Sequence, residues 1–500
     1  MSSSEQFNKS AGRGAIFQVS GGVVQTVIRI GASTILARLL LPSDFGLFGI
    51  ALLLSELVLR IGALGMGVGI IAKKNVTNED LCTAFWTMFG LRLVMFLTCF
   101  FLAPFLAEFF NDLRLTAVIR TISLTFLFQI IGVVGNALLM KQLQFFQIFI
   151  VNITSALIES GLAVFLVLFY FKNYWGLVIA MVSASLWRHL LVFFFSRWVP
   201  KPVFHLESFR FLFRYGINSL GESITTYFNQ NIDFLLVGRL LGTRVLGFYE
   251  FAYRIPTMIL DRIAIPVQAI FFPVLVHVNT SNEKLAAGYN KGMKYVSLIC
   301  FPALGGLAVV AELAVPVLWG DQWLVIVPSL RILCLAAVLN CATFSSRVLF
   351  LCKDRPDIPF LFSLVSLVVT FLTVGFFGYF WGIIGIASAM LLSTSLGVIL
   401  QLAAFRMINS SVIKFFKSLW PVIASTAAMG IVVYFLLTIF HAYEFAAVLK
   451  LGLSILSGAA VYILFLYFLF GETFVEVVET FIQVLGIQER MDRLKKQRAV

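Results

Sequence analysis

Twelve charged side chains lie well inside long apolar stretches of this chain of 500 residues. A charge that faces lipid costs about 2.5 to 3.5 kcal/mol on insertion scales, so these groups should face water or one another. In such surroundings a guanidinium group can pair with an anion, and a shielded carboxylate can take up a proton or a cation. The twelve residues are Arg29, Glu56, Arg60, Arg92, Glu159, Arg188, Glu222, Asp233, Glu250, Arg254, Asp261 and Arg262.

Two pairs of these charges have a local structural interpretation. Glu56 and Arg60 stand four residues apart with the acid first, and so do Glu250 and Arg254. This is the favourable order for an ion pair within one helix. We interpret both pairs as structural.

Four further charges are open to either a structural or a functional interpretation. Arg188 lies near the end of its apolar stretch, where a long side chain can extend to the membrane interface. Asp261 and Arg262 are adjacent and can neutralise each other, and Glu159 is the most isolated of the acids.

Polar residues form stripes on two of the apolar stretches, at spacings of three, four or seven that place them on one helix face. One interpretation is a seam that only holds helices together. The other is a wall of a water-filled vestibule that binds an anionic cargo and a coupling cation. On the second interpretation the assignments are Arg29 and Arg92 for the anion, Gln18, Gln25 and Asn229 for the wall, and Glu222 and Asp233 for the cation.

Composition sets the elements that must position these groups. The chain is 60% hydrophobic and 12% charged, too apolar for a water-soluble domain of this size. It is predicted to be an all-α membrane protein, because the apolar runs are long enough for spanning helices and lack the alternation of barrel strands. The fourteen runs are 14–37, 45–71, 82–106, 115–139, 146–170, 174–196, 211–237, 245–276, 291–317, 325–351, 358–379, 382–405, 418–440 and 445–470.

An internal duplication organises these runs. The segment 38–48 returns 201 residues later, without a gap, as 239–249. Trp175-Gly176 returns as Trp381-Gly382, and the junction at Lys141 resembles that at Lys353. Transporters are often built from such repeats around a shared site. We predict two pseudo-symmetric lobes of six helices, an N-terminal lobe at 14–205 and a C-terminal lobe at 206–406, followed by two accessory helices at 407–470.

The distribution of charge predicts the orientation. The formal charge of +13 is carried mostly by alternate loops, a pattern of membrane topology rather than of nucleic-acid binding. It places both termini in the cytoplasm, including the N-terminal segment 1–13. Residues 471–500 are predicted to form an amphipathic helix and a basic tail that contacts membrane lipids. The first run shows no cleavable signal sequence.

The sequence shows no metal or cofactor signature, because the six Cys lie in or beside apolar runs and only four His are present. We expect reduced, buried thiols and no cofactor. No catalytic residues are assigned either, because no outer loop carries a cluster of carboxylates or His.

A family resemblance rests on motifs at both repeat junctions and beyond. They are Asp233 with Gly238-Arg239-Leu240-Leu241-Gly242, Leu246-Gly247-Phe248-Tyr249, Ala252-Tyr253, Ala37-Arg38-Leu39-Leu40, Phe45-Gly46-Leu47, Lys73-Lys74 after a glycine-rich run end, Phe301-Pro302-Ala303 and Leu318-Trp319-Gly320. Together they resemble the polysaccharide-transporter branch of the multidrug/oligosaccharidyl-lipid/polysaccharide exporters, which includes the Wzx-type flippases.

The resemblance implies a flippase of the bacterial inner membrane that carries a polyprenyl-diphosphate-linked oligosaccharide by alternating access, for lipopolysaccharide, capsule or exopolysaccharide synthesis. Cationic cavity residues of that superfamily engage the diphosphate, which by location would be Arg29 and Arg92 here. Polysaccharide polymerase and chain-length proteins would be its partners. The alternatives are a cation-coupled multidrug antiporter, a flippase for the peptidoglycan precursor, a membrane enzyme acting on lipid-linked sugars, and a scaffold that transports nothing.

Overall fold

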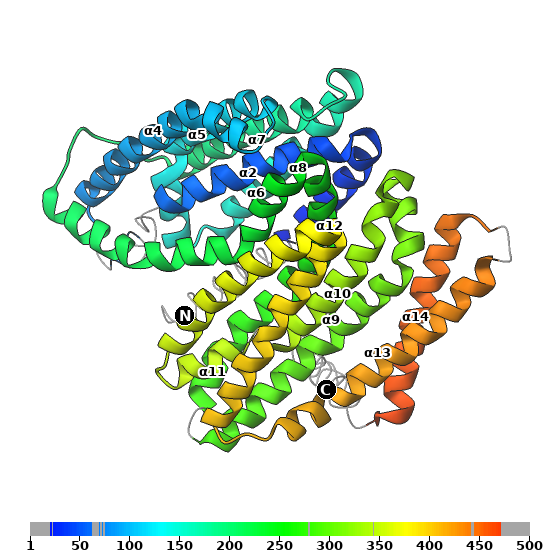
Figure 1. Cartoon of the computed structure of the whole chain (residues 1–500). Coiled ribbons are helices and arrows are strands. Elements are labelled where there is room, and N and C mark those ends of the chain that lie inside the picture. Colours follow the sequence, from blue (N-terminus) through cyan, green and yellow to red (C-terminus); the bar gives the residue numbers. More distant parts are fainter. Residues whose placement is uncertain are drawn as a thin grey trace, which may run out of the picture. The chain divides into compact units, whose positions relative to one another are not determined.

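The computed structural model describes the backbone of residues 21–22, 24–62, 70, 73, 76–278, 281–343, 345–441 and 445–471. Every regular element in these ranges is helical (Figure 1). A helix over 24–39 comes first. It is followed by α2 (Pro42–Gly62), α4 (Asn78–Phe109), α5 (Arg114–Lys141), α6 (Phe145–Phe169), α7 (Trp175–Ser196), α8 (Leu206–Val278), α9 (Asn282–Trp319), η1 (Asp321–Ile326), α10 (Val327–Thr343), α11 (Ser346–Cys352), α12 (Asp357–Met407), α13 (Val412–His441) and α14 (Ala447–Leu469).

The all-α membrane fold is confirmed. In the described ranges, nine helices are long and apolar enough to cross a membrane. Large apolar side chains remain exposed along them, such as Phe468 on α14 and Tyr379 on α12, with 75% and 76% of their surface accessible, as lipid contact requires. The number of fourteen spans stays a prediction.

Two of the helices are each broken by a glycine. In α8 the break is at Gly242, with φ 80° and ψ 173°, and in α12 it is at Gly382, with φ 56°. Residues with a Cβ rarely adopt these positive φ angles. The predicted boundaries between runs seven and eight, and between runs eleven and twelve, therefore fall at single backbone kinks. In the first half, the counterpart of Gly382 is a true loop between α6 and α7.

The repeat is visible in the backbone as well as in the sequence. Positive φ angles occur at Leu143 and Asp354, 211 residues apart, and at Arg197 and Asn409, 212 residues apart. All four follow the C-terminal end of a helix, where a left-handed residue ends the hydrogen-bond ladder. The spacing agrees with the drift between the repeats seen in the sequence.

The chain forms two compact units, 1–251 with 363–389 and 252–362 with 390–500. In the first unit α5 packs against α4 and α7, and α7 packs against α6. In the second, α9 packs against α10 and α13, and α13 against α14. The predicted limits of the lobes, the accessory helices and the tail stay predictions, and residues 1–13 and 472–500 lie outside the described residues.

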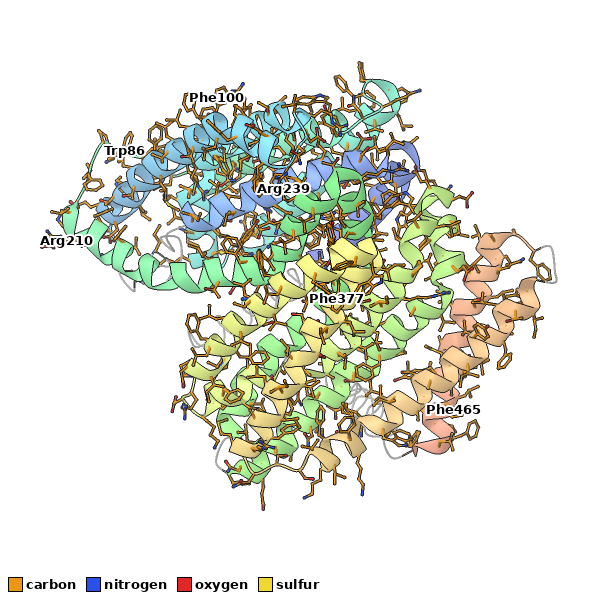
Figure 2. All side chains as sticks on the ribbon, viewed as in Figure 1. Trp86, Phe100, Arg210, Arg239, Phe377 and Phe465 are labelled. Carbon is orange, nitrogen blue, oxygen red and sulfur yellow. The ribbon has the colours of Figure 1, made fainter. Side chains whose placement is uncertain are left out.

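A dense set of polar contacts fixes the start of α4 in the first unit. Thr77 and Asp80 form a capping box, in which each side chain accepts a hydrogen bond from the other residue's backbone N–H. Asp80 also accepts hydrogen bonds from Lys73 at 2.7 Å and from Ser208 at 2.6 Å. The indole of Trp86, labelled in Figure 2, donates to the carbonyl of Lys201 at 2.8 Å. These contacts tie the α7–α8 connection to the helix that carries Arg92.

Candidate functional site

A polar cavity of 210 Å³ lies among α4, α5, α6 and α7. All of its wall belongs to the first unit. Two arginines, one histidine and three amides supply the polar part, and apolar residues complete it. The lining residues are Arg92, Gln129, Gly132, Val133, Asn136, Leu139, Ile148, Val151, Asn152, Arg188, His189 and Val192.

Arg92 is buried in this wall, with 7% of its surface accessible. Its Nη1 lies 3.5 Å from the sulfur of Met95, a weak acceptor, and its buried Nε has no hydrogen-bond partner. Within the described ranges it makes no ion pair. A buried guanidinium without a carboxylate is an uncompensated charge and needs water or an anion nearby.

Arg188 lines the same cavity from α7 and donates a hydrogen bond to Asn152 Oδ1. The adjacent His189 donates from Nδ1 to the carbonyl of Ser185, at 2.7 Å, and both Arg92 and Arg188 act electrostatically on its ring. Arg188 is therefore a cavity residue, rather than the interfacial side chain considered from the sequence.

Arg29 lies beside this group on the helix over 24–39. Its Nη2 is 2.9 Å from Glu159 Oε2, and 53% of the Arg29 side chain is exposed. Glu159 is thus not isolated, because the sequence could not show that the first and fifth apolar runs are neighbours. Both partners act electrostatically on Arg188. Three arginines against one glutamate leave the cluster formed by Arg29, Arg92, Glu159 and Arg188 with a net positive charge.

The two copies of the repeat junction cross each other closely. A Cβ built on Gly46 would lie 1.8 Å from the carbonyl oxygen of Thr243, and a Cβ on Gly247 would lie 1.8 Å from that of Pro42. Gly46 and Gly247 are 201 residues apart, and so are Pro42 and Thr243. The contact is therefore reciprocal, and it requires glycine in both copies.

Side chains of the α4–α5 loop hold this crossing. Arg239, labelled in Figure 2, lies over the ring of Phe109 at 5.1 Å, and its Nη1 can donate to the side-chain oxygen of Asn111 at 2.6 Å. The hydroxyl of Thr243 donates to Asp112 at 3.3 Å. Partial burial raises the pKa of Asp112, but hydrogen bonds and the charge from the neighbouring Arg114 outweigh it and hold the pKa below its usual value.

Asp233, predicted to bind a coupling cation, is buried and accepts a hydrogen bond of 2.5 Å from the hydroxyl of Tyr249. This contact joins the two parts of α8 across the kink at Gly242. The side chain of Glu222 lies outside the described residues, and its predicted role stays a prediction. Gln18 also lies outside them.

The remaining predicted residues occupy ordinary helical positions. Arg60 Nη2 lies 2.7 Å from Glu56 Oε1, within one helix. Asn229 donates to the carbonyl of Thr225, and Gln25 is half-buried. The predicted pair of Glu250 with Arg254 stays a prediction. Asp261 and Arg262 are both exposed on α8.

Polar cavity residues other than the two arginines were missed by the sequence analysis. Gln129, Gly132 and Asn136 follow one another at spacings of three and four on α5, so they share one helix face. This was a usable signal, because uncharged amides in an apolar run also avoid lipid. Asn152 and His189 stand alone on their helices, and only the packing of α6 against α7 brings them to the cavity.

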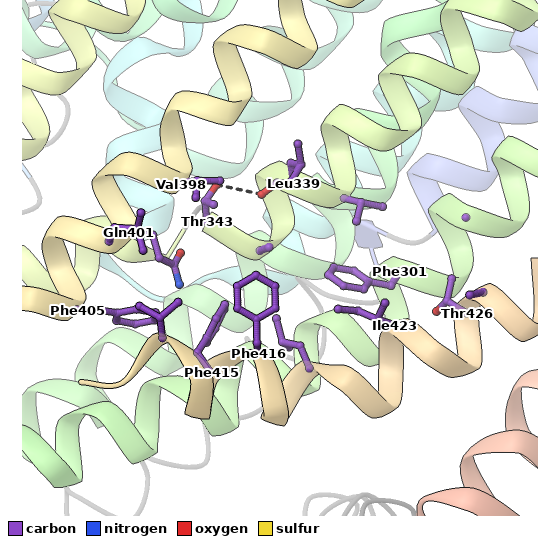
Figure 3. Close-up of a pocket in the computed structure, with 17 residues that line it drawn as sticks. Phe301, Leu339, Thr343, Val398, Gln401, Phe405, Phe415, Phe416, Ile423 and Thr426 are labelled. Atoms are coloured by element: carbon purple, nitrogen blue, oxygen red, sulfur yellow. Dashed lines mark hydrogen bonds between the residues drawn. The ribbon is translucent and has the colours of Figure 1, made fainter.

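The second unit contains a larger apolar cavity of 380 Å³ between α9, α10, α12 and α13 (Figure 3). Phe301, Phe405, Phe415 and Phe416 line it, and Gln401 and Thr343 are among its few polar residues. Its wall has no charged side chain, so it offers a place for hydrocarbon and none for a phosphate group.

Comparisons with known proteins agree on one relationship. The family model described as "Polysaccharide biosynthesis protein" matches residues 35–328. The lipopolysaccharide biosynthesis protein WzxC of Escherichia coli is 30% identical over 82% of this chain and 86% of its own. The teichuronic acid biosynthesis protein TuaB of Bacillus subtilis is 26% identical over 82% and 85%. Among solved structures, the lipid II flippase MurJ in an inward closed conformation has a TM-score of 0.74 at 14% identity, covering 92% of this chain and 99% of its own.

Proposed function

Because the chain belongs to the polysaccharide biosynthesis protein family, we propose that it moves a polyprenyl-diphosphate-linked oligosaccharide across the bacterial inner membrane. The chain is a multi-pass membrane protein, and relatives named for lipopolysaccharide, teichuronic acid and succinoglycan biosynthesis support a saccharide cargo. The protein acts as a carrier and not as an enzyme. The observation that carries the proposal is the net positive charge of the first unit at membrane depth, which suits an anionic head group.

Alternating access needs a closure on one side of the membrane. With both termini in the cytoplasm, as the basic loops predict, the junctions at 38–48 and 239–249 lie at the outer face. The reciprocal crossing at Gly46 and Gly247 then closes the protein toward the outside. Release of the cargo requires this contact to separate.

Arg29 is our candidate for the diphosphate contact. Its side chain is half exposed, and its partner Glu159 is a carboxylate that a diphosphate can replace. Guanidinium binds both groups through paired hydrogen bonds, so the exchange conserves the contact. Arg92 was predicted for the same role. Its buried position in a cavity of 210 Å³, below the roughly 300 to 1,000 Å³ of pockets for drug-sized ligands, favours a smaller ligand.

Coupling and partners belong to the same proposal. A proton or cation bound at Glu222 or Asp233 would drive the cycle, and Asp233 would then have to exchange its hydrogen bond with Tyr249 during transport. The polymerase and the chain-length proteins that consume the cargo at the outer face would be functional partners.

The test is complementation in a strain that lacks the gene. Loss of the protein should leave lipid-linked oligosaccharide on the cytoplasmic face, and the wild-type gene should restore its appearance outside. We expect Arg29→Ala to lower this transport about tenfold to a hundredfold, the effect of one lost charge-assisted contact, and Arg29→Lys to lower it less. The matched control is Arg331→Gln, which removes an exposed arginine paired with Glu312 in the second unit.

Two results would count against the proposal. If the deletion leaves the lipid-linked oligosaccharide evenly distributed, the protein does not carry it. If Arg29→Ala transports as well as Arg331→Gln, the diphosphate contact lies elsewhere.

A further inference from the structure

The cavity among α4, α5, α6 and α7 has a charge that no protein group balances. Arg92 and Arg188 both line it, and neither makes an ion pair within the described ranges. No carboxylate is among its lining residues. Two like charges in a small enclosed volume repel each other, and burial removes the water that would screen them.

Hydrogen-bond donors are also in excess at this site. Arg92 Nε is buried and has no partner, and its Nη1 meets only the sulfur of Met95. The amides of Gln129 and Asn136 add N–H donors to the wall, and Asn136 is exposed, which gives the site access to solvent. A ligand that only accepts hydrogen bonds would satisfy these groups together.

We propose that this cavity is a binding site for a small inorganic oxyanion of the phosphate class, separate from the site of the transported head group. A tetrahedral oxyanion accepts paired hydrogen bonds from guanidinium groups and needs no partner that donates to it. The volume of 210 Å³ equals that of about seven water molecules, enough for one such anion with a few waters.

Cavity size and wall composition separate this site from the cargo path. An oligosaccharide with its diphosphate is too large to enter. All lining residues come from helices of one unit, so an anion bound there would link α4, α5 and α7 through Arg92, Gln129 and Arg188. It would neutralise one or both arginines and remove a repulsion that otherwise opposes the packing of these helices.

The test is equilibrium dialysis of radiolabelled orthophosphate against the purified full-length protein in detergent, at constant ionic strength set with gluconate. We expect saturable binding of one phosphate per chain. Arg92→Met should weaken it about tenfold to a hundredfold, since it keeps the apolar stem and removes the charged donors. Arg188→Met should also weaken binding, and Arg331→Gln should leave it unchanged.

Thermal unfolding provides a second measurement that does not depend on one variant folding well. Phosphate should raise the melting temperature of the wild type and of Arg331→Gln, and should not raise that of Arg188→Met. A wild type without saturable binding, or an equal effect of phosphate on all variants, overturns the proposal.

A further arm identifies the source of the anion. A short-chain polyprenyl diphosphate replaces orthophosphate in the same dialysis. Binding of the lipid without any binding of orthophosphate would assign the cavity to the head group and overturn the separate site. These results are independent of complementation, because transport can succeed or fail whether or not orthophosphate binds.

Discussion

At the scale of single residues, a charge in the membrane interior is explained by its nearest partner, and the partners here differ. Glu56 and Arg60 satisfy each other within one turn of helix. Arg29 finds Glu159 on another helix, 130 residues away. Arg92 has only a thioether and a cavity. Only the first of these arrangements is encoded in local spacing, so only the first could be predicted from the sequence.

The hydrogen bond from Tyr249 to Asp233 makes a prediction about stability. Tyr249→Phe removes the hydroxyl donor from a buried carboxylate, which costs about 1 to 3 kcal/mol. We expect a lower melting temperature of the purified protein in detergent. Tyr434→Phe is the control, because Tyr434 on α13 is exposed. Equal melting temperatures of the two variants would show that the hydroxyl does not hold the kink of α8.

At the scale of elements, the crossing of α2 with α8 depends on two glycines in equivalent positions. The sequence analysis found both copies of the motif but not their contact, because a repeat reports ancestry and not which surfaces meet. The same limit applies to the kinks. Gly242 lies in a recognisable junction, whereas nothing in the sequence distinguishes the break at Gly382 from the loop before Trp175.

Substitution of these glycines tests the outer closure. A Cβ at Gly46 or Gly247 would overlap a backbone carbonyl oxygen at 1.8 Å, so the two helices must separate. We expect Gly46→Ala and Gly247→Ala to lower transport more than tenfold, and each to do so to a similar extent, since the contact is reciprocal. Gly90→Ala is the control, because a Cβ there meets only open space.

Protein amounts in the membrane must be compared in the same cells. Full transport by both glycine variants at normal expression would rule out the crossing as a closure that must form. Loss of protein in both variants would instead make it a folding contact.

At the scale of the whole molecule, composition and run length were sufficient to predict an all-α membrane protein. Hydrophobic periodicity indicated most helices, because lipid imposes the same requirement on every span. The cavity could not be predicted in the same way. Its volume results from side chains that α4, α5, α6 and α7 fail to supply, and no residue in any one helix records that gap.

The orientation predicted from the basic loops can be measured with single cysteines. Leu113→Cys, in the exposed α4–α5 loop, should react with a membrane-impermeant maleimide added to intact spheroplasts. Gln142→Cys, in the next loop, should react only after permeabilisation. Wild-type protein provides the background, because its six cysteines are all buried. The opposite labelling pattern would invert the topology and place the crossing at the cytoplasmic face.

The reciprocal crossing has a consequence for the origin of the chain. Two identical half-length proteins, each with an even number of spans, would sit in the membrane with the same orientation and could meet about a twofold axis. One glycine codon would then have served both sides of that interface. After gene fusion the two codons became independent, and a mutation in either one now breaks half of a symmetry that the ancestral dimer maintained automatically.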